Sequence, residues 1–270
     1  LAQAHWRSMH AFNLHSQRGK LLCSAVLLLC SKGNGERDAG PLQRVLFSPE
    51  FAESRSTRCL DGSPAGYYLR LQPGSRDWAF DLQGGGLCVT SLDCASRLKH
   101  DLGSSKEWSS TRMQGNGVLD ANAASNPFAR FNHVFLPYCS GDTWTGTRRE
   151  PSAFLGGVFT AGHLIIEAIL EHLFNTSNMG TDGVDRVILS GESAGAIGVL
   201  HNADFVSTWF KSHVGQSVKV KAVARAGLYF PEGVTYFQAV WLFGHAITAT
   251  MQLLFIIIYA ISLCTYVYYY

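Results

Sequence analysis

The sequence predicts an α/β protein built on a parallel β-sheet, and three consecutive stretches carry this prediction. Residues 154–174 place apolar side chains at helical spacing. Residues 184–189 form a short β-branched run, typical of a buried strand, and residues 194–209 again have a helical pattern. A further strand is predicted before them at 132–139. A helix that connects two strands allows them to be parallel neighbours, so this order favours a parallel sheet.

The turn between the last predicted strand and helix contains the pattern Gly-x-Ser-x-Gly, with Ser193 at its centre. A serine on a tight strand-to-helix turn projects its hydroxyl, and Gly191 and Gly195 let the two elements pack closely. The backbone N–H of Ala194 then points to where an oxyanion would form. The pattern also arises by chance in simple packing turns. Its strand–turn–helix context favours a nucleophile.

A second glycine-rich turn, residues 83–88, follows a predicted strand at 77–82. Three consecutive glycines allow a backbone to approach a ligand closely. We expect the N–H groups of Gly85 and Gly86 to complete the oxyanion hole, although a flexible loop has the same composition. Another strand at 67–71, with a Pro-Gly turn after it, predicts a hairpin with 77–82.

A polar loop at 140–146 follows the strand predicted at 132–139. Ligands of open α/β sheets bind at the carboxyl ends of strands, so Asp142 and Trp144 are candidates to line the substrate pocket. An ordinary turn-forming role is the alternative for Asp142.

The overall charge is close to balanced, with 22 Lys and Arg against 20 Asp and Glu. This balance argues against a nucleic-acid partner, which basic residues would have to hold through its phosphates. The sequence has no Cys-x-x-Cys pair with nearby histidines that would indicate a metal site. We expect no cofactor.

Cysteine usage favours an oxidising, extracellular compartment. Outside the apolar segments the sequence has an even set, Cys59, Cys88, Cys94 and Cys139. Asn175 begins a possible glycosylation sequon, which is consistent with secretion.

The N-terminal region is expected to lie outside the main domain. Residues 1–31 contain basic residues followed by about ten apolar ones, which resembles a secretory signal; a buried helix is the alternative. Residues 32–58 are polar and irregular, and we expect them to form a linker.

Several of these motifs together resemble one family, the pectin acetylesterase/Notum family, over roughly residues 59–230. The motifs, in chain order, are Cys59-x-Asp61-Gly62-Ser63-Pro64-x-Gly66-Tyr67, Gly84-Gly85-Gly86-x-Cys88, Cys94-x-x-Arg97, Leu102-Gly103-Ser104-Ser105, Tyr138-Cys139-x-Gly141-Asp142 and Gly191-x-Ser193-Ala194-Gly195.

The resemblance implies a secreted serine carboxylesterase with an α/β-hydrolase-like parallel sheet over residues 59–232. It implies that Ser193 is the nucleophile and that Gly85, Gly86 and Ala194 donate to the oxyanion. It also implies the disulfides Cys88–Cys94 and Cys59–Cys139. The substrates that it suggests are an acetylated polysaccharide such as pectin or a lipidated protein such as a palmitoleoylated Wnt.

The sequence departs from this family at three positions near the predicted site. Gln83 and Leu87 stand where plant-type members usually have Glu and Trp around the three glycines. Arg225 stands at the Asp of an Asp-x-Gly pattern. Replacing an acid by a base there puts the local interaction network in question.

The rest of a catalytic triad is not evident. The acids after Ser193 are Asp204 and Glu232, and the histidines are His201, His213 and His245. His201 and Asp204 lie about 12 Å or more along the helix from the serine. We therefore expect a hydrolase fold that is incomplete at its C-terminus and an inactive or nearly inactive chain, because a serine without a base is a weak nucleophile.

Residues 240–270 contain no Asp, Glu, Lys or Arg, and 246–270 are long enough to span a membrane. One interpretation is a membrane anchor with tyrosines at the interface, in which case the chain is a catalytically dead, membrane-anchored binding protein. The other is a misjoined gene model, which the incomplete sheet and triad favour. A peptidase or lipase on the same fold is a third possibility.

Overall fold

The computed structural model describes residues 40–113, 117–227 and 266–268. Its strands form one mixed sheet of order β4-β1-β2-β5-β3-β6-β7-β8. The strands are β1 (Leu42–Leu46), β2 (Gly66–Arg70), β3 (Asp77–Leu82), β4 (Thr111–Arg112), β5 (Asn132–Leu136), β6 (Arg186–Glu192), β7 (Lys219–Arg225) and β8 (Tyr266–Tyr268). The helices are α2 (Pro49–Arg55), α3 (Ser91–Arg97), η1 (Ser105–Glu107), η2 (Gly117–Leu119), η3 (Ala153–Leu155), α4 (Gly162–Thr176), α5 (Asn178–Asp182) and α6 (Ala194–His213).

The centre of the sheet is parallel, as the sequence predicts. β5, β3, β6 and β7 run in one direction, and their registers bring Leu82 of β3 opposite Gly191 of β6. Every residue of β5 is buried, and the five middle residues of β6 are buried too. The glycine-rich loop after β3 and the Ser193 turn after β6 therefore leave the sheet side by side.

The predicted hairpin of β2 and β3 is wrong. β5 lies between these two strands, antiparallel to β2 and parallel to β3. The Asn132 side chain of β5 explains part of this insertion. Its oxygen accepts from the Gln72 N–H at 2.9 Å, and its amide nitrogen donates to the Ser75 carbonyl at 2.9 Å. The connection between β2 and β3 thus closes over the end of β5 rather than forming a hairpin turn.

The linker prediction for residues 32–58 is wrong over its second half. β1 pairs with β2, and α2 follows it, with Ser48 capping the helix by accepting the Phe51 N–H. Leu42, Phe47 and Ala52 are buried in the main core. These three apolar residues are spread through a polar stretch. The composition of the stretch therefore does not indicate the strand and the helix. Residues 1–39, including the predicted signal, lie outside the described residues.

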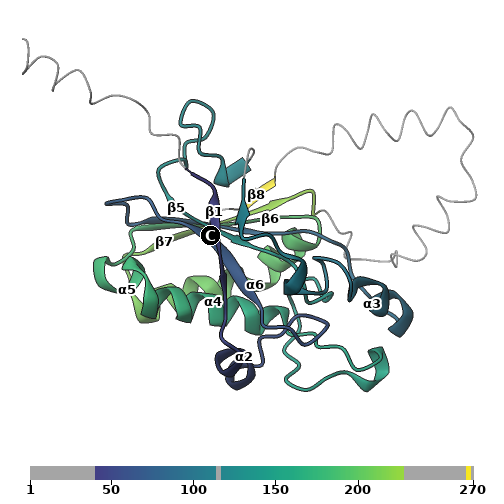
Figure 1. Ribbon diagram of the computed structural model, residues 1–270. Coiled ribbons are helices and arrows are strands. Elements are labelled where there is room, and N and C mark those ends of the chain that lie inside the picture. Colours follow the sequence, from purple (N-terminus) through teal and green to yellow (C-terminus); the bar gives the residue numbers. More distant parts are fainter. Residues whose placement is uncertain (1–39, 114–116, 228–265, 269–270) are drawn as a thin grey trace, which may run out of the picture. The chain divides into compact units, whose positions relative to one another are not determined.

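The crossover helix begins later than its apolar spacing predicts. Gly156 and Gly157 both have positive φ, 82° and 84°, which separates η3 from α4. Figure 1 shows α4, α5 and α6 along one face of the sheet. His163 of α4 contacts the Asn202 side chain of α6 at 2.6 Å, so this histidine joins the two helices. Asn175, the glycosylation candidate, is exposed in the last turn of α4.

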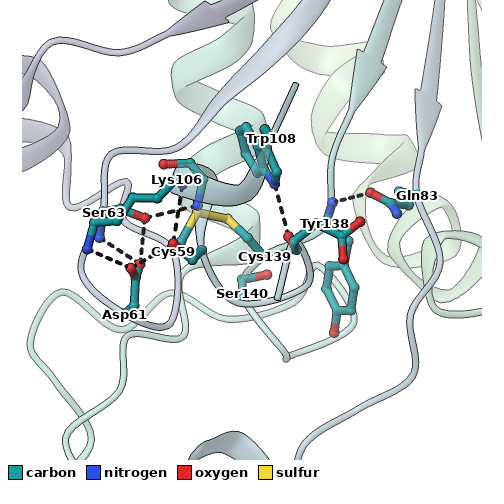
Figure 2. Close-up of a disulfide and its surroundings, with 12 residues drawn as sticks. Cys59, Asp61, Ser63, Gln83, Lys106, Trp108, Tyr138, Cys139 and Ser140 are labelled. Atoms are coloured by element: carbon teal, nitrogen blue, oxygen red, sulfur yellow. Dashed lines mark hydrogen bonds and ion pairs between the residues drawn. A yellow bond between two sulfur atoms is a disulfide. The ribbon is translucent and has the colours of Figure 1, made fainter. Parts of the chain in front are cut away.

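Both predicted disulfides are present. Cys59–Cys139 closes a long loop, with Cα atoms 4.9 Å apart, and Cys88–Cys94 closes a short one. Figure 2 shows Asp61 beside the first disulfide, accepting hydrogen bonds from Ser63 and Lys106. Burial alone would raise the pKa of Asp61, but these hydrogen bonds and one from Ser104 outweigh it and hold the pKa below its ordinary value.

Most of the predicted apolar tail, 240–270, lies outside the described residues. Its described part, β8, pairs antiparallel with β7. Tyr266 and Tyr268 therefore belong to a strand. Among the residues described, no helix is long and apolar enough to cross a membrane.

The two disulfides should contribute unequally to stability. They span 80 and 6 residues, and a longer closed loop removes more entropy from the unfolded chain. Replacing Cys59 and Cys139 by alanine should lower the free energy of unfolding by about 4 kcal/mol, against about 2 kcal/mol for Cys88 and Cys94. Urea unfolding of the two double variants measures this. Equal losses would contradict the loop-entropy explanation.

His133 of β5 should make stability depend on pH. It is fully buried, with Nδ1 2.5 Å from Arg70 and Nε2 2.8 Å from the Phe128 carbonyl. Burial lowers its pKa to about 4. Between pH 6.5 and 4 the unfolded chain therefore binds a proton that the folded chain does not, and stability falls as the pH falls. Over this range the free energy of unfolding should fall by about 3 kcal/mol. Above pH 6.5 His133 should no longer make it depend on pH.

Urea unfolding at pH 7 and pH 4.5 tests this dependence. His133→Gln keeps one donor and one acceptor without the titration, so it should lose much less stability on acidification. Exposed His201→Gln is the control and should behave as the unsubstituted chain. An unchanged pH dependence in His133→Gln would rule out His133 as its source.

Candidate active site

Ser193 occupies the sharp turn between β6 and α6 that its sequence predicts. Its φ of 56° and ψ of −118° are rarely adopted by a residue with a side chain. The Ser193 N–H donates to the Arg225 carbonyl at 3.1 Å, which anchors the turn to the end of β7. The surrounding structure thus imposes a strained backbone at this serine, as in a nucleophile elbow.

The glycines around Ser193 are required by close backbone contacts. A Cβ at Gly191 would lie 2.4 Å from the Gly195 carbonyl oxygen, and one at Gly195 would lie 2.1 Å from the Leu82 carbonyl oxygen. A Cβ at Gly84 would lie 2.6 Å from the Glu192 carbonyl oxygen and 3.1 Å from the Ser193 Cβ. The glycine-rich loop after β3 therefore packs directly against the serine turn.

Gly85 and Gly86 take backbone conformations that suit glycine, with φ of 158° and 73°. A Cβ at Gly85 would lie 2.7 Å from the Tyr138 ring and 2.8 Å from Leu102. Within the described part of the chain, the N–H groups of both glycines have no hydrogen-bond acceptor. The Ala194 N–H, at the first position of α6, has no partner within its helix either.

Side-chain donors hold the carbonyl groups of this loop. The Trp144 indole donates to the Gln83 carbonyl at 3.0 Å, Arg97 to Gly85 at 2.7 Å, and the Tyr138 hydroxyl to Gly86 at 2.9 Å. In a trans peptide the carbonyl and the following N–H point in opposite directions, and the structure describes no cis bond. Fixing the Gly85 carbonyl therefore also fixes the direction of the Gly86 N–H.

The Cys88–Cys94 disulfide ties the far end of this loop to α3. The Cys88 N–H also donates to the Gly141 carbonyl at 2.9 Å, and a Cβ at Gly141 would lie 2.6 Å from the Cys88 sulfur. Because Arg97 lies on the same helix as Cys94, the disulfide and the guanidinium hold the loop from one side.

Asp142 and Trp144 lie beneath the loop in a supporting position, which differs from the expected pocket lining. The Asp142 carboxylate accepts from the Ser140 hydroxyl at 2.6 Å, the Trp144 N–H at 3.0 Å and the Gly162 N–H at 2.7 Å. Burial raises its pKa in spite of these bonds. The Trp144 side chain is fully buried. Both residues organise a turn, the role weighed for Asp142 as the alternative.

Histidines and acids beyond Ser193 do not form a triad in the described residues. His201 and Asp204 are exposed on α6. His213, at the end of α6, stacks on Trp209 with ring centroids 4.3 Å apart. His245 and Glu232, the remaining candidates, lie outside the described residues. No described histidine is hydrogen-bonded to the Ser193 hydroxyl.

Arg225, which stands in place of an acid, forms an ion pair beside the serine turn. Its Nη2 lies 2.7 Å from Asp81 of β3, and its Nη1 lies 3.9 Å from Glu192 of β6. Burial raises the pKa of Asp81, and Arg225 opposes this shift. The base therefore pairs with a buried acid two strands away, across β6.

Sequence reasoning left three supporting residues without a role: Arg97, Tyr138 and Asp81. Arg97 and Tyr138 belong to motifs that carry the family resemblance. The motifs do not predict that these side chains donate to carbonyls of the glycine-rich loop. The Asp81–Arg225 pair joins residues 144 positions apart. No local pattern indicates such a pair.

A cavity of about 370 Å³ opens beside Gln83, at the carboxyl ends of β3 and β5. Its walls include the charged side chains of Asp101, Glu107 and Arg112. Gln83 borders this cavity and also accepts the Tyr138 N–H through its side-chain oxygen at 3.0 Å, as Figure 2 shows. The cavity therefore lies at the residue from which the glycine-rich loop begins.

Comparisons with known proteins agree with this geometry. The family model "Pectinacetylesterase" matches residues 46–243. The mouse palmitoleoyl-protein carboxylesterase NOTUM is 38% identical over 177 residues, covering 64% of this chain and 34% of that protein. The Drosophila melanogaster palmitoleoyl-protein carboxylesterase NOTUM is 34% identical over 203 residues, covering 71% of this chain and 29% of that protein.

A solved structure of the Wnt deacylase Notum from Drosophila superposes with a TM-score of 0.63 and 32% sequence identity. The superposition covers 74% of this chain and 59% of that one. The chain spans about a third of the length of the curated relatives that it matches. The α/β-hydrolase-like fold and the match over residues 46–243 establish that the chain belongs to the pectinacetylesterase family.

Proposed function

We propose that this chain carries the nucleophile and oxyanion hole of a serine carboxylesterase that cleaves an acyl ester. The observation that carries this proposal is the contact of the strained Ser193 turn with the Gly84–Gly86 loop, with N–H groups free of acceptors on both segments in the described part of the chain. A simple packing turn does not require two separate segments with free N–H donors to lie against one serine.

The proposed reaction is acyl transfer. The Ser193 oxygen attacks the ester carbonyl carbon, and its proton passes to a base. The carbonyl oxygen becomes an oxyanion that accepts from the N–H groups of Gly85, Gly86 and Ala194. The alcohol leaves with a proton, and water then releases the acid from the acylated serine. Each oxyanion donor typically contributes about 3 kcal/mol to the transition state.

We propose that this chain alone turns over esters slowly, since His201 and Asp204, the candidate base and acid on α6, are exposed on the helix that begins at the serine. General base catalysis usually contributes about 10² to 10⁴ in rate. The oxyanion donors do not depend on that base, because side chains of the described part hold them. Ser193 should therefore accept an acyl group from an activated ester more readily than the chain completes a catalytic cycle.

The proposed substrate is an acylated biopolymer outside the cell, either a fatty-acylated protein or an acetylated polysaccharide. The names of the relatives, which are palmitoleoyl-protein carboxylesterases, support the first. Leu87 and Val89, which follow the glycines, have half of their surface exposed and offer apolar contacts to a fatty chain. The two buried disulfides support an oxidising compartment.

Ser193 should become acylated by p-nitrophenyl acetate and p-nitrophenyl octanoate. Slow deacylation should let the adduct accumulate toward one acyl group per chain, as intact-mass spectrometry measures. Peptide mapping should place the group on Ser193, and Ser193→Ala should remove it. Ser96→Ala, at an exposed serine of α3, is the control. Equal labelling of the chain and its Ser193→Ala variant would refute the proposed function.

Arg97 should support acylation from outside the reacting atoms. Arg97→Met removes the donor to the Gly85 carbonyl and frees the Gly86 N–H to turn away. The rate constant of Ser193 acylation should then fall by about tenfold, less than for loss of a direct oxyanion donor. Lys99→Met, just beyond the same helix, should leave the rate unchanged. Stopped-flow release of p-nitrophenol measures both, and equal rates would show that the loop holds its shape without Arg97.

A further inference from the structure

Arg225 contacts the serine turn through its backbone and its side chain. Its carbonyl accepts the Ser193 N–H at 3.1 Å. Its guanidinium reaches past β6 to Asp81 of β3, at 2.7 Å, and passes 3.9 Å from Glu192. One residue thus connects the strand that leads into the oxyanion loop with the strand that leads into the serine turn.

The side-chain pair joins a buried acid to a partly buried base, since the Arg225 side chain is 28% exposed. Asp81 is only 5% exposed, and the Arg225 Nε is buried without a hydrogen-bond partner in the described part of the chain. Gly117 closes over the guanidinium, since a Cβ there would lie 3.1 Å from the Arg225 Nη1. Removing Arg225 would leave the buried Asp81 carboxylate without its partner charge, which is costly.

We propose that Arg225 is a positioning residue, whose ion pair with Asp81 sets the Ser193 turn against the oxyanion loop. Asp81 lies two residues before Gln83, whose carbonyl begins the loop. Among the described residues, the Arg225 carbonyl is the acceptor of the Ser193 N–H. A shift of Arg225 would therefore move the serine relative to the loop. The inference rests on the proposed function for its catalytic meaning.

A second ion pair on β3 supplies a control. Arg186 of β6 pairs with Asp77 of β3, with its Nε 2.9 Å from the carboxylate. The register places this pair at the opposite end of the strands, four residues from the level of Asp81. It joins β3 to β6 as the first pair joins β3 to β7, but it has no contact with the serine turn.

The experiment compares Arg225→Gln, Arg225→Lys, the double variant Asp81→Asn with Arg225→Gln, and Arg186→Gln in the full 270-residue chain. Three quantities are measured: urea unfolding, hydrogen exchange of the Ser193 amide, and the rate constant of Ser193 acylation by p-nitrophenyl acetate. The rates are taken per folded molecule. This normalisation distinguishes an effect on the position of Ser193 from an effect on the stability of the chain.

Arg225→Gln should speed Ser193 amide exchange and slow acylation, each by about tenfold or more. Arg225→Lys, which keeps a charge near Asp81, should recover part of both. The double variant should recover stability, because the unpaired carboxylate is gone, but neither exchange nor acylation. Arg186→Gln should change neither of the last two. If Arg225→Gln does not fold, Arg225→Lys and the double variant are compared with the unsubstituted chain instead.

Two results would overturn the inference: Ser193 exchange unchanged in the Arg225 variants, or exchange and acylation that recover together with stability in the double variant. The second result would mean that the pair acts through stability alone. Altered exchange in a chain whose Ser193 is never acylated would instead refute the proposed function and leave the positioning of the turn supported.

Discussion

The structure depends on one close contact, in which the glycine-rich loop after β3 rests on the serine turn after β6. At Gly84 no Cβ fits, because it would lie 2.6 Å from the Glu192 carbonyl oxygen. This contact requires parallel neighbouring strands that end at the same level, which the pairing of Leu82 with Gly191 provides. The central sheet, the glycines and the strained Ser193 backbone together allow the loop and the turn to lie this close.

The contact is held from two sides by different forces. On the outer side, Arg97, Tyr138 and the buried Trp144 donate to the loop carbonyls, and the Cys88–Cys94 disulfide fixes the end of the loop. On the other side, the ion pair between buried Asp81 and partly buried Arg225 joins β3 to β7. Arg225 can stand at this position because its charge is neutralised by Asp81, two strands away across β6.

Local patterns predicted the parts of the fold and site that depend on neighbouring residues. The parallel centre followed from the order of strand and helix patterns, and the Ser193 turn from its glycines. The β2–β3 hairpin was wrong because β5, more than 50 residues later, lies between these strands. β1 and α2 were missed because few apolar residues anchor them. Arg97 and Asp81 hold the site through partners that are distant in the sequence, so the spacing of residues does not predict these contacts. The disulfide pairing was predicted from the family resemblance.

The most direct test of this account is a crystal structure of the chain after reaction with a small alkyl phosphonate ester. The account predicts a covalent bond to the Ser193 oxygen, with one phosphonyl oxygen about 2.7–3.1 Å from the N–H groups of Gly86 and Ala194. A phosphonate on Ser193 whose oxygens all face solvent would contradict the oxyanion hole. A crystal in which Ser193 is unmodified and another residue carries the group would contradict the assignment of the nucleophile itself.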